Sequence, residues 1–166
     1  MNTFILSDNG KPNHKAVEIL TKYWDGVLPI DPAAIAAKMG ITVIPVSSRG
    51  YSGKAYQVNN QSVIEYDQTE FLLRQRFTIA HELGHHVLSH TDNGHQFRDE
   101  ANKFSFNISI PEETQANKFA AELLAPEIAI KHFVFKEKIN SLTQLAELFS
   151  VSTVVMKYRL TNLGLL

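Results

Sequence analysis

The stretch from Arg76 to His90, RFTIAHELGHHVLSH, contains four of the chain's seven histidines, and the chain has no cysteine. Because residues four apart project from nearly the same side of an α-helix, His81 and His85 can direct their imidazoles at one point. Glu82 lies about 100 degrees further round the helix, where its carboxylate can reach a water without being a ligand. The spacing therefore predicts a divalent-metal site, with zinc as the expected ion and Glu82 as the catalytic base.

A catalytic zinc ion usually has three protein ligands, so one more must come from elsewhere. His86 lies on another face of the predicted helix and His90 lies beyond the pair, so neither completes the site easily. The next helix begins PEETQ, and its Glu112 and Glu113 flank the apolar stripe on opposite edges. Helical geometry alone does not choose between these carboxylates. Asn117, one turn later, can hydrogen-bond a ligand histidine, which favours Glu113.

Peptide hydrolysis by such a site needs a hydrogen-bond donor for the oxyanion in addition to the metal. Tyr51, Tyr66 and His95 are the candidates, and the sequence does not choose among them. An extended substrate could also add to the edge of a short sheet, beside the GKAYQV or the QSVIEY segment.

The elements that position these residues are predicted from periodicity and capping. Asp31 is expected to cap a short helix that begins at Pro32 and ends at Gly40. Three short β-branched segments, ITVIPV, GKAYQV and QSVIEY, predict three strands of one antiparallel sheet, with a turn at Asn59 and Asn60. Further helices are predicted at residues 13–24, 69–90, 111–125, 128–138, 142–149 and 152–163, and a surface loop is expected at 91–107.

These elements predict an α+β fold, mainly helical, with a small three-stranded antiparallel sheet and a C-terminal helical hairpin. One domain is expected over residues 1–166. It would comprise N-terminal helices and the sheet at 1–68, the zinc-site helices at 69–126, and a hairpin similar to a helix-turn-helix at 127–166.

Composition limits the partners of the chain. Its 16 basic and 17 acidic residues give a net charge of −1, which provides no broad attraction to nucleic acid or to an anionic membrane. No apolar run approaches the roughly 18 residues of a membrane span, and the N-terminus does not resemble a secretory signal. A soluble cytoplasmic protein is therefore expected.

The motif RFTIAHELGHHVLSH followed by ETQANKFAAELLAP resembles the ImmA/IrrE family of metallo-endopeptidases. The segments DPAAIAAKMGITVIPV and LAELFSVSTVVMKYRLTNLGL resemble its N-terminal and C-terminal elements. The resemblance implies a gluzincin-like fold, one zinc ion bound by His81, His85 and Glu113, and catalysis by Glu82. It also implies a protein substrate, a partner repressor with an Xre-type helix-turn-helix whose cleavage relieves transcriptional repression. Manganese or another divalent ion could occupy the same ligands.

A second function class is suggested by LTQLAELFSVSTVVMKYRL, which also resembles a helix-turn-helix. The alternative is a non-cleaving regulatory module that contains zinc and binds DNA through these helices. From residue 141 to the end, however, the charged residues are only Glu147, Lys157 and Arg159, a net charge of +1. Phosphate contacts normally need more cationic side chains. The two helices are therefore interpreted as a structural hairpin packing beneath the zinc helix.

Overall fold

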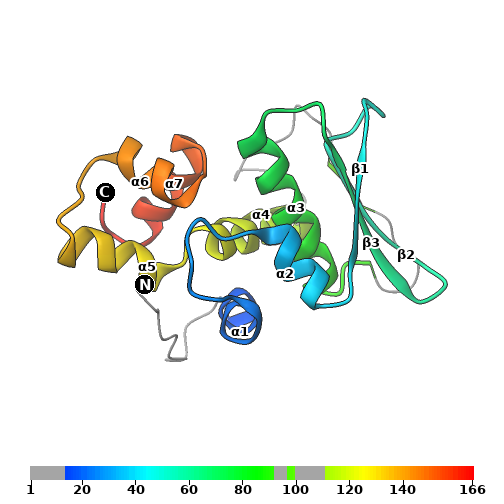
Figure 1. Ribbon diagram of the computed structural model, residues 1–166, viewed down its shortest axis with the longest axis horizontal. Coiled ribbons are helices and arrows are strands. Elements are labelled where there is room, and N and C mark those ends of the chain that lie inside the picture. Colours follow the sequence, from blue (N-terminus) through cyan, green and yellow to red (C-terminus); the bar gives the residue numbers. More distant parts are fainter. Residues whose placement is uncertain (1–13, 92–96, 100–110) are drawn as a thin grey trace. The chain divides into compact units, whose positions relative to one another are not determined.

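A computed structural model describes residues 14–91, 97–99 and 111–166 of the chain (Figure 1). The fold is α+β and mainly helical, as predicted from the sequence. Two compact units are present, one formed by Asp31–Ala120 and the other by Met1–Ile30 together with Ala121–Leu166. Within the described part of the chain, no helix combines the length and the apolar content that crossing a bilayer requires.

The unit Asp31–Ala120 contains a four-stranded sheet in the order β1-β3-β2-β4. Its strands are β1 (Thr42–Val46), β2 (Gly53–Val58), β3 (Gln61–Asp67) and the short β4 (Phe97–Asp99). Strand β2 is antiparallel to β3 and β4, whereas β1 is parallel to β3.

The three predicted strands are present, but the expectation of a purely antiparallel sheet was wrong. Strand β3 lies between β1 and β2, so β1 and β2 do not form a hairpin. The connection from β1 to β2 instead crosses the end of β3. The fourth strand, β4, lies in the stretch where only a surface loop was expected. Because β3 is interior, the QSVIEY segment offers no free edge to a substrate, and β4 already pairs with the first half of β2.

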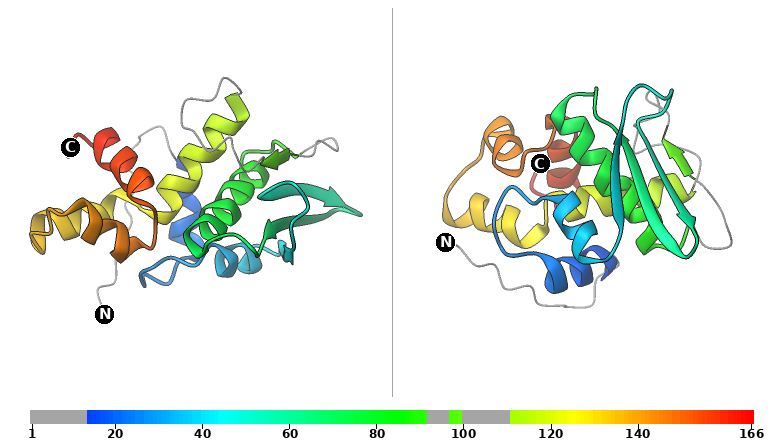
Figure 2. Two further views of the ribbon diagram at one scale, coloured as in Figure 1. Left: turned by 90° about the horizontal axis from the view of Figure 1, so that it is seen from above. Right: turned by 45° about the vertical axis from the view of Figure 1, so that its right-hand side comes forward.

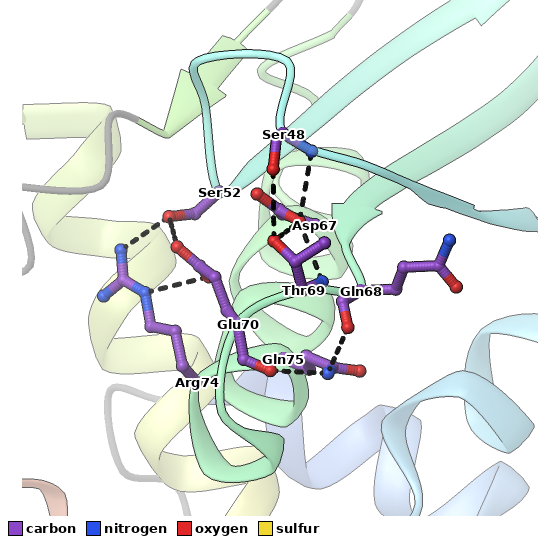
Figure 3. A network of polar contacts seen from close by, with 8 residues as sticks. All are labelled: Ser48, Ser52, Asp67, Gln68, Thr69, Glu70, Arg74 and Gln75. Carbon is purple, nitrogen blue, oxygen red and sulfur yellow. Dashed lines mark hydrogen bonds and ion pairs between the residues drawn. The ribbon is translucent and has the colours of Figure 1, made fainter.

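A group of polar contacts holds the crossing from β1 to β2 (Figure 3). The Asp67 carboxylate accepts hydrogen bonds from the Thr69 hydroxyl at 2.6 Å, from the Thr69 backbone N–H at 2.9 Å and from the Ser48 backbone N–H at 3.4 Å. The Thr69 hydroxyl contributes most to lowering the pKa of Asp67, because a hydrogen bond stabilises the ionised carboxylate. The backbone N–H of Asp67 also donates to the Ser52 carbonyl at 2.8 Å. These bonds fix the loop across the end of β3.

Two helices of this unit, α2 (Pro32–Lys38) and α3 (Leu72–Val87), contact each other, and α3 runs along β2 and β3 (Figure 2). Asp31 caps α2 as predicted, accepting hydrogen bonds from the next helix residues at 3.0 and 3.2 Å. The predicted turn between β2 and β3 is also present, with positive φ at Asn59 and Asn60. Helix α3 is buried from Phe77 to His85. The segment FTIAHELGH of the motif therefore forms part of the core of this unit.

Helix α4 (Pro111–Leu124) begins in the unit Asp31–Ala120 and ends in the other. It starts at Pro111, the first residue of the helix predicted at 111–125.

The other unit is helical. Its elements are α1 (His14–Tyr23), the end of α4, α5 (Glu127–Lys131), the π-helical turn η2 (His132–Lys136), α6 (Leu142–Phe149) and α7 (Thr153–Asn162). The single helix expected at 128–138 is thus a short α-helix followed by a π-helical turn. The C-terminal hairpin is present, with Ser141 and Ser152 as N-caps and Ser150 in the left-handed region between its helices.

A buried ion pair holds α7 within this unit. The Arg159 guanidinium pairs with the Glu122 carboxylate, and its Nε donates to the Ala125 carbonyl at 3.0 Å. The side chains of Arg159 and Glu122 are only 4% and 8% exposed. Burial raises the pKa of Glu122 despite the nearby guanidinium. The pair therefore connects the end of α4 to α7.

Removing one partner of this pair should destabilise the protein strongly. We expect Arg159→Met to lower the free energy of unfolding by about 3 kcal/mol or more, because the Glu122 carboxylate loses its buried counter-charge. The double variant Glu122→Leu/Arg159→Met should regain most of that loss, since no buried charge remains. Urea unfolding of the three proteins measures both effects, and a double variant less stable than Arg159→Met would contradict this account.

Candidate metal centre

Helices α3 and α4 approach each other closely at Gly84. A Cβ added there would lie 3.0 Å from Cδ1 of Phe119 and 3.3 Å from the backbone of Ala116. A side chain larger than a methyl group at position 84 would therefore separate the two helices. Gly84 lies between His81 and His85 in α3, so the close crossing brings α4 to the histidines.

Three electron-pair donors converge at this crossing. The Nε2 atoms of His81 and His85 lie 3.1 Å apart, and each lies 3.2 Å from an oxygen of Glu113. The imidazoles are buried, and the Glu113 side chain is 14% exposed. Among the residues that the structure describes, this is the only group of three or more such ligands placed to hold an ion. Glu112, the alternative that helical geometry left open, is not part of it.

The surroundings keep these groups in the forms that bind metals. The carboxamide oxygen of Asn117 accepts a hydrogen bond from His81 Nδ1 at 2.7 Å, which leaves Nε2 of a neutral His81 with its lone pair. Burial is the main cause that lowers the pKa of His85 to about 4. Burial alone would raise the pKa of Glu113, but its contacts with the His81 and His85 rings outweigh burial and lower that pKa. An ionised Glu113 and a neutral His85 are therefore the forms expected near neutral pH.

This donor set fits a divalent cation. Three lone-pair donors within 3.2 Å of one another repel unless a proton or a cation lies among them. Atoms that bind one zinc ion at about 2.0–2.2 Å in tetrahedral geometry lie roughly 3.3 Å apart, close to these separations. Imidazole and carboxylate ligands suit zinc, and manganese also accepts them.

Glu82 lies beside the cluster without belonging to it. Its side chain is fully buried and lies against β2, where a Cβ added at Gly53 would be 2.8 Å from Glu82 Oε1 and 2.4 Å from Cγ2 of Thr78. Only glycine leaves this space for the carboxylate. The strand backbone therefore forms one wall of the Glu82 site.

A second group of contacts anchors this part of β2 to the start of α3 (Figure 3). The Ser52 hydroxyl donates to Glu70 Oε1 at 2.7 Å and accepts from Arg74 Nη2 at 3.1 Å. Arg74 Nε also lies 3.6 Å from Glu70 Oε2. Ser52 precedes Gly53, so these contacts help to hold the wall next to Glu82.

The other predicted site residues are placed as follows. The Tyr51 hydroxyl donates to the Glu65 carboxylate, which also accepts from Tyr56 at 2.9 Å. Tyr66 pairs with Gly53 across the sheet, so its half-buried side chain shares the face that α3 covers. His95 lies outside the described residues.

The two remaining histidines of the motif have contacts that sequence reasoning missed. His86 Nε2 donates to the Val63 carbonyl at 2.9 Å and its Nδ1 lies 3.0 Å from the Thr91 hydroxyl, so His86 ties α3 to β3. His90 Nδ1 lies 2.9 Å from Nδ1 of His85. The sequence carried no periodic signal for this contact, because His90 lies beyond the end of α3.

Enlarging Gly84 should loosen the centre. In Gly84→Val, overpacking against α4 should lower the free energy of unfolding by about 1–3 kcal/mol and weaken zinc binding, since Glu113 would move away from the histidines. Gly84→Ala is the matched control, because a small shift admits its Cβ and alanine favours a helix by up to about 1 kcal/mol. Calorimetric zinc titration and urea unfolding test this, and equal zinc affinity in wild type and Gly84→Val would refute it.

A comparison with known protein families shows to which family the chain belongs. A family model described as the IrrE N-terminal-like domain, a peptidase family, matches residues 36–161, about three quarters of the chain. A search of curated proteins gave no match. The matched residues include α3, all four strands of the sheet and the whole of α4, and so include every member of the cluster. The resemblance found in the sequence is thereby confirmed, and the chain belongs to the IrrE N-terminal-like family of metallopeptidases.

Proposed function

We propose that this protein is a zinc-dependent endopeptidase in which His81, His85 and Glu113 hold one zinc ion and Glu82 is the catalytic residue. The observation that carries the proposal is the convergence of two imidazole nitrogens and a carboxylate at 3.1–3.2 Å, in a chain of a metallopeptidase family. The position of Glu82 directly after His81 in α3 supports its role, because Glu82 follows a ligand in the chain without belonging to the ligand cluster.

The chemistry divides between the ion and the chain. A divalent ion bound at these ligands would supply Lewis-acid activation of water and of the scissile carbonyl. The Glu82 carboxylate accepts a proton from the attacking water and returns a proton to the leaving amine. Its burial removes competing solvent from around this proton transfer.

Stabilisation of the oxyanion needs a further donor. Tyr66 is our proposal among the described residues, because its side chain lies on the same sheet face as Gly53, the residue that contacts Glu82. Tyr51 is disfavoured, because its hydroxyl already donates to Glu65. His95 stays a prediction from the sequence.

For the substrate we propose a partner repressor with an Xre-type helix-turn-helix, cleaved in the cytoplasm to relieve repression. This proposal rests on the family resemblance, which carries the substrate class with it. A peptidase needs a protein substrate, and membership of the family supports that part directly.

The competing DNA-binding function is disfavoured by the burial of Arg159. Of the charged residues after position 140, Arg159 is buried and paired with Glu122, which leaves only Lys157 and Glu147 exposed. Their charges cancel, so the hairpin offers almost no electrostatic attraction to phosphates. DNA binding that falls steeply with salt in a gel-shift series would restore this alternative.

Two substitutions separate metal binding from catalysis. Glu82→Gln should retain zinc and lower cleavage by roughly 100-fold or more, because the amide cannot accept the proton from water. His85→Ala should lose both zinc and cleavage, and removal of zinc with a chelator should reproduce this loss. The assay combines zinc analysis with incubation of each protein with a purified Xre-type repressor. Equal cleavage by all three proteins would exclude the peptidase, whereas a zinc-loaded wild type that leaves the repressor intact would exclude only this substrate.

The wall formed by Gly53 gives a further test of Glu82. In Gly53→Ala, the new methyl group would overlap Glu82 Oε1 and Thr78 Cγ2, so the carboxylate must move. We expect cleavage to fall by about 10-fold or more with zinc affinity nearly unchanged, because misplacing a catalytic group by about 1 Å is costly. The double variant Gly53→Ala/Thr78→Ser removes one of the two overlaps and should recover part of the activity. A loss of zinc equal to the loss of cleavage would contradict this role of the wall.

A further inference from the structure

Directly after α3 ends, the backbone turns so that His90 lies beside His85. The backbone N–H of His90 donates to the His85 carbonyl at 2.8 Å, and that of Ser89 donates to the His86 carbonyl at 3.1 Å. Ser89 has a φ of 62°, so the two bonds form the Schellman motif that ends many helices. In a continuing helix, His90 would project well away from His85. The left-handed residue instead brings the two imidazoles to ring centroids 5.1 Å apart.

Hydrogen bonds define a direction through these rings. The carboxamide oxygen of Gln115 lies 3.0 Å from His90 Nε2 and can only accept, so His90 Nε2 carries the proton. A neutral His90 then has its lone pair on Nδ1, which lies 2.9 Å from His85 Nδ1. His85 Nδ1 must therefore donate. The other ring nitrogen of a neutral His85, Nε2, then keeps its lone pair and faces Glu113.

The same polarity is present at the other histidine of the cluster. His81 Nδ1 donates to the oxygen of Asn117, so its Nε2 also presents a lone pair to Glu113. Both imidazoles are thus oriented by amide oxygens of α4. For His81 the contact is direct, whereas for His85 it passes through His90.

We propose that His90 and Gln115 are positioning residues that fix His85 in the tautomer able to bind the metal. This inference rests on the proposed metal site, but it concerns the hydrogen-bond chain outside the three ligands. His90 touches neither the ion nor the substrate in this role, and acts only through Nδ1 of His85.

Asparagine and leucine at position 90 form a matched pair of nearly equal size. An asparagine there would keep an oxygen acceptor near the position of the histidine Nδ1, whereas leucine has none. For the full-length protein, we expect His90→Leu to weaken zinc affinity by about 10–100-fold and His90→Asn to change it by less than about threefold. Competition with a chromophoric zinc chelator measures both, and thermal unfolding checks that both variants are folded.

Reversing the polarity of the hydrogen bond between Gln115 and His90 is a second test. Gln115 is exposed, so its substitution should not disturb folding. Glutamate at position 115 still accepts from His90 and should preserve zinc affinity. Lysine offers only donors and should weaken affinity, because it would favour the opposite tautomer of both histidines.

A tautomer measurement distinguishes failure of this inference from failure of the metal site. In the zinc-free protein, long-range ¹H–¹⁵N spectra should show His85 protonated at Nδ1 and His90 at Nε2. A His85 protonated at Nε2, or equal zinc affinity in wild type and His90→Leu, would overturn the role of His90. If the wild type shows the expected tautomers but binds no zinc, the hydrogen-bond chain is supported and the proposed metal site fails.

Discussion

The metal centre is built around a local electrostatic conflict, the mutual repulsion of its ligand atoms. The Nε2 atoms of His81 and His85 lie 3.1 Å apart and 3.2 Å from the oxygens of Glu113, with the imidazoles buried away from water. Such an arrangement is unfavourable by itself, because the groups repel and have lost their hydration. It persists because rigid elements impose it: α3 is buried between α4 and the sheet, and Gly84 allows α4 to approach. A cation removes the conflict, which is why the geometry points to metal chemistry.

Helix α4 contributes far more to this centre than one ligand. Glu113 supplies the carboxylate, Asn117 orients His81, and Gln115 begins the hydrogen-bond chain that reaches His85. These three polar residues of PEETQANKF thus each have a partner on or just after α3. The apolar residues that follow serve packing, with Ala116 at the crossing and Phe119 against Gly84.

Local rules predicted most of the site. The spacing of His81 and His85 follows from the helical repeat alone, and the caps and the asparagine turn follow from side-chain chemistry and backbone preference. The choice between Glu112 and Glu113 could not be made from helical geometry, because both flank the buried stripe and only the position of α3 selects one. The parallel pairing of β1 with β3 was missed for a similar reason, since strand order depends on contacts between segments distant in sequence. His90 was missed because helical periodicity was extended through Ser89, where the helix has already ended.

The location of Glu113 in the first turn of α4 has a kinetic consequence. Helix ends fray far more readily than helix centres, and this end precedes the first buried residue of α4, Ala116. The histidines, in contrast, lie where α3 is fully buried. Exchange of a bound ion should therefore proceed by transient opening of a single helical turn, with the carboxylate leaving first while the imidazoles stay in place. The residence time of the ion would then be set by this fraying equilibrium, and not by unfolding of the domain.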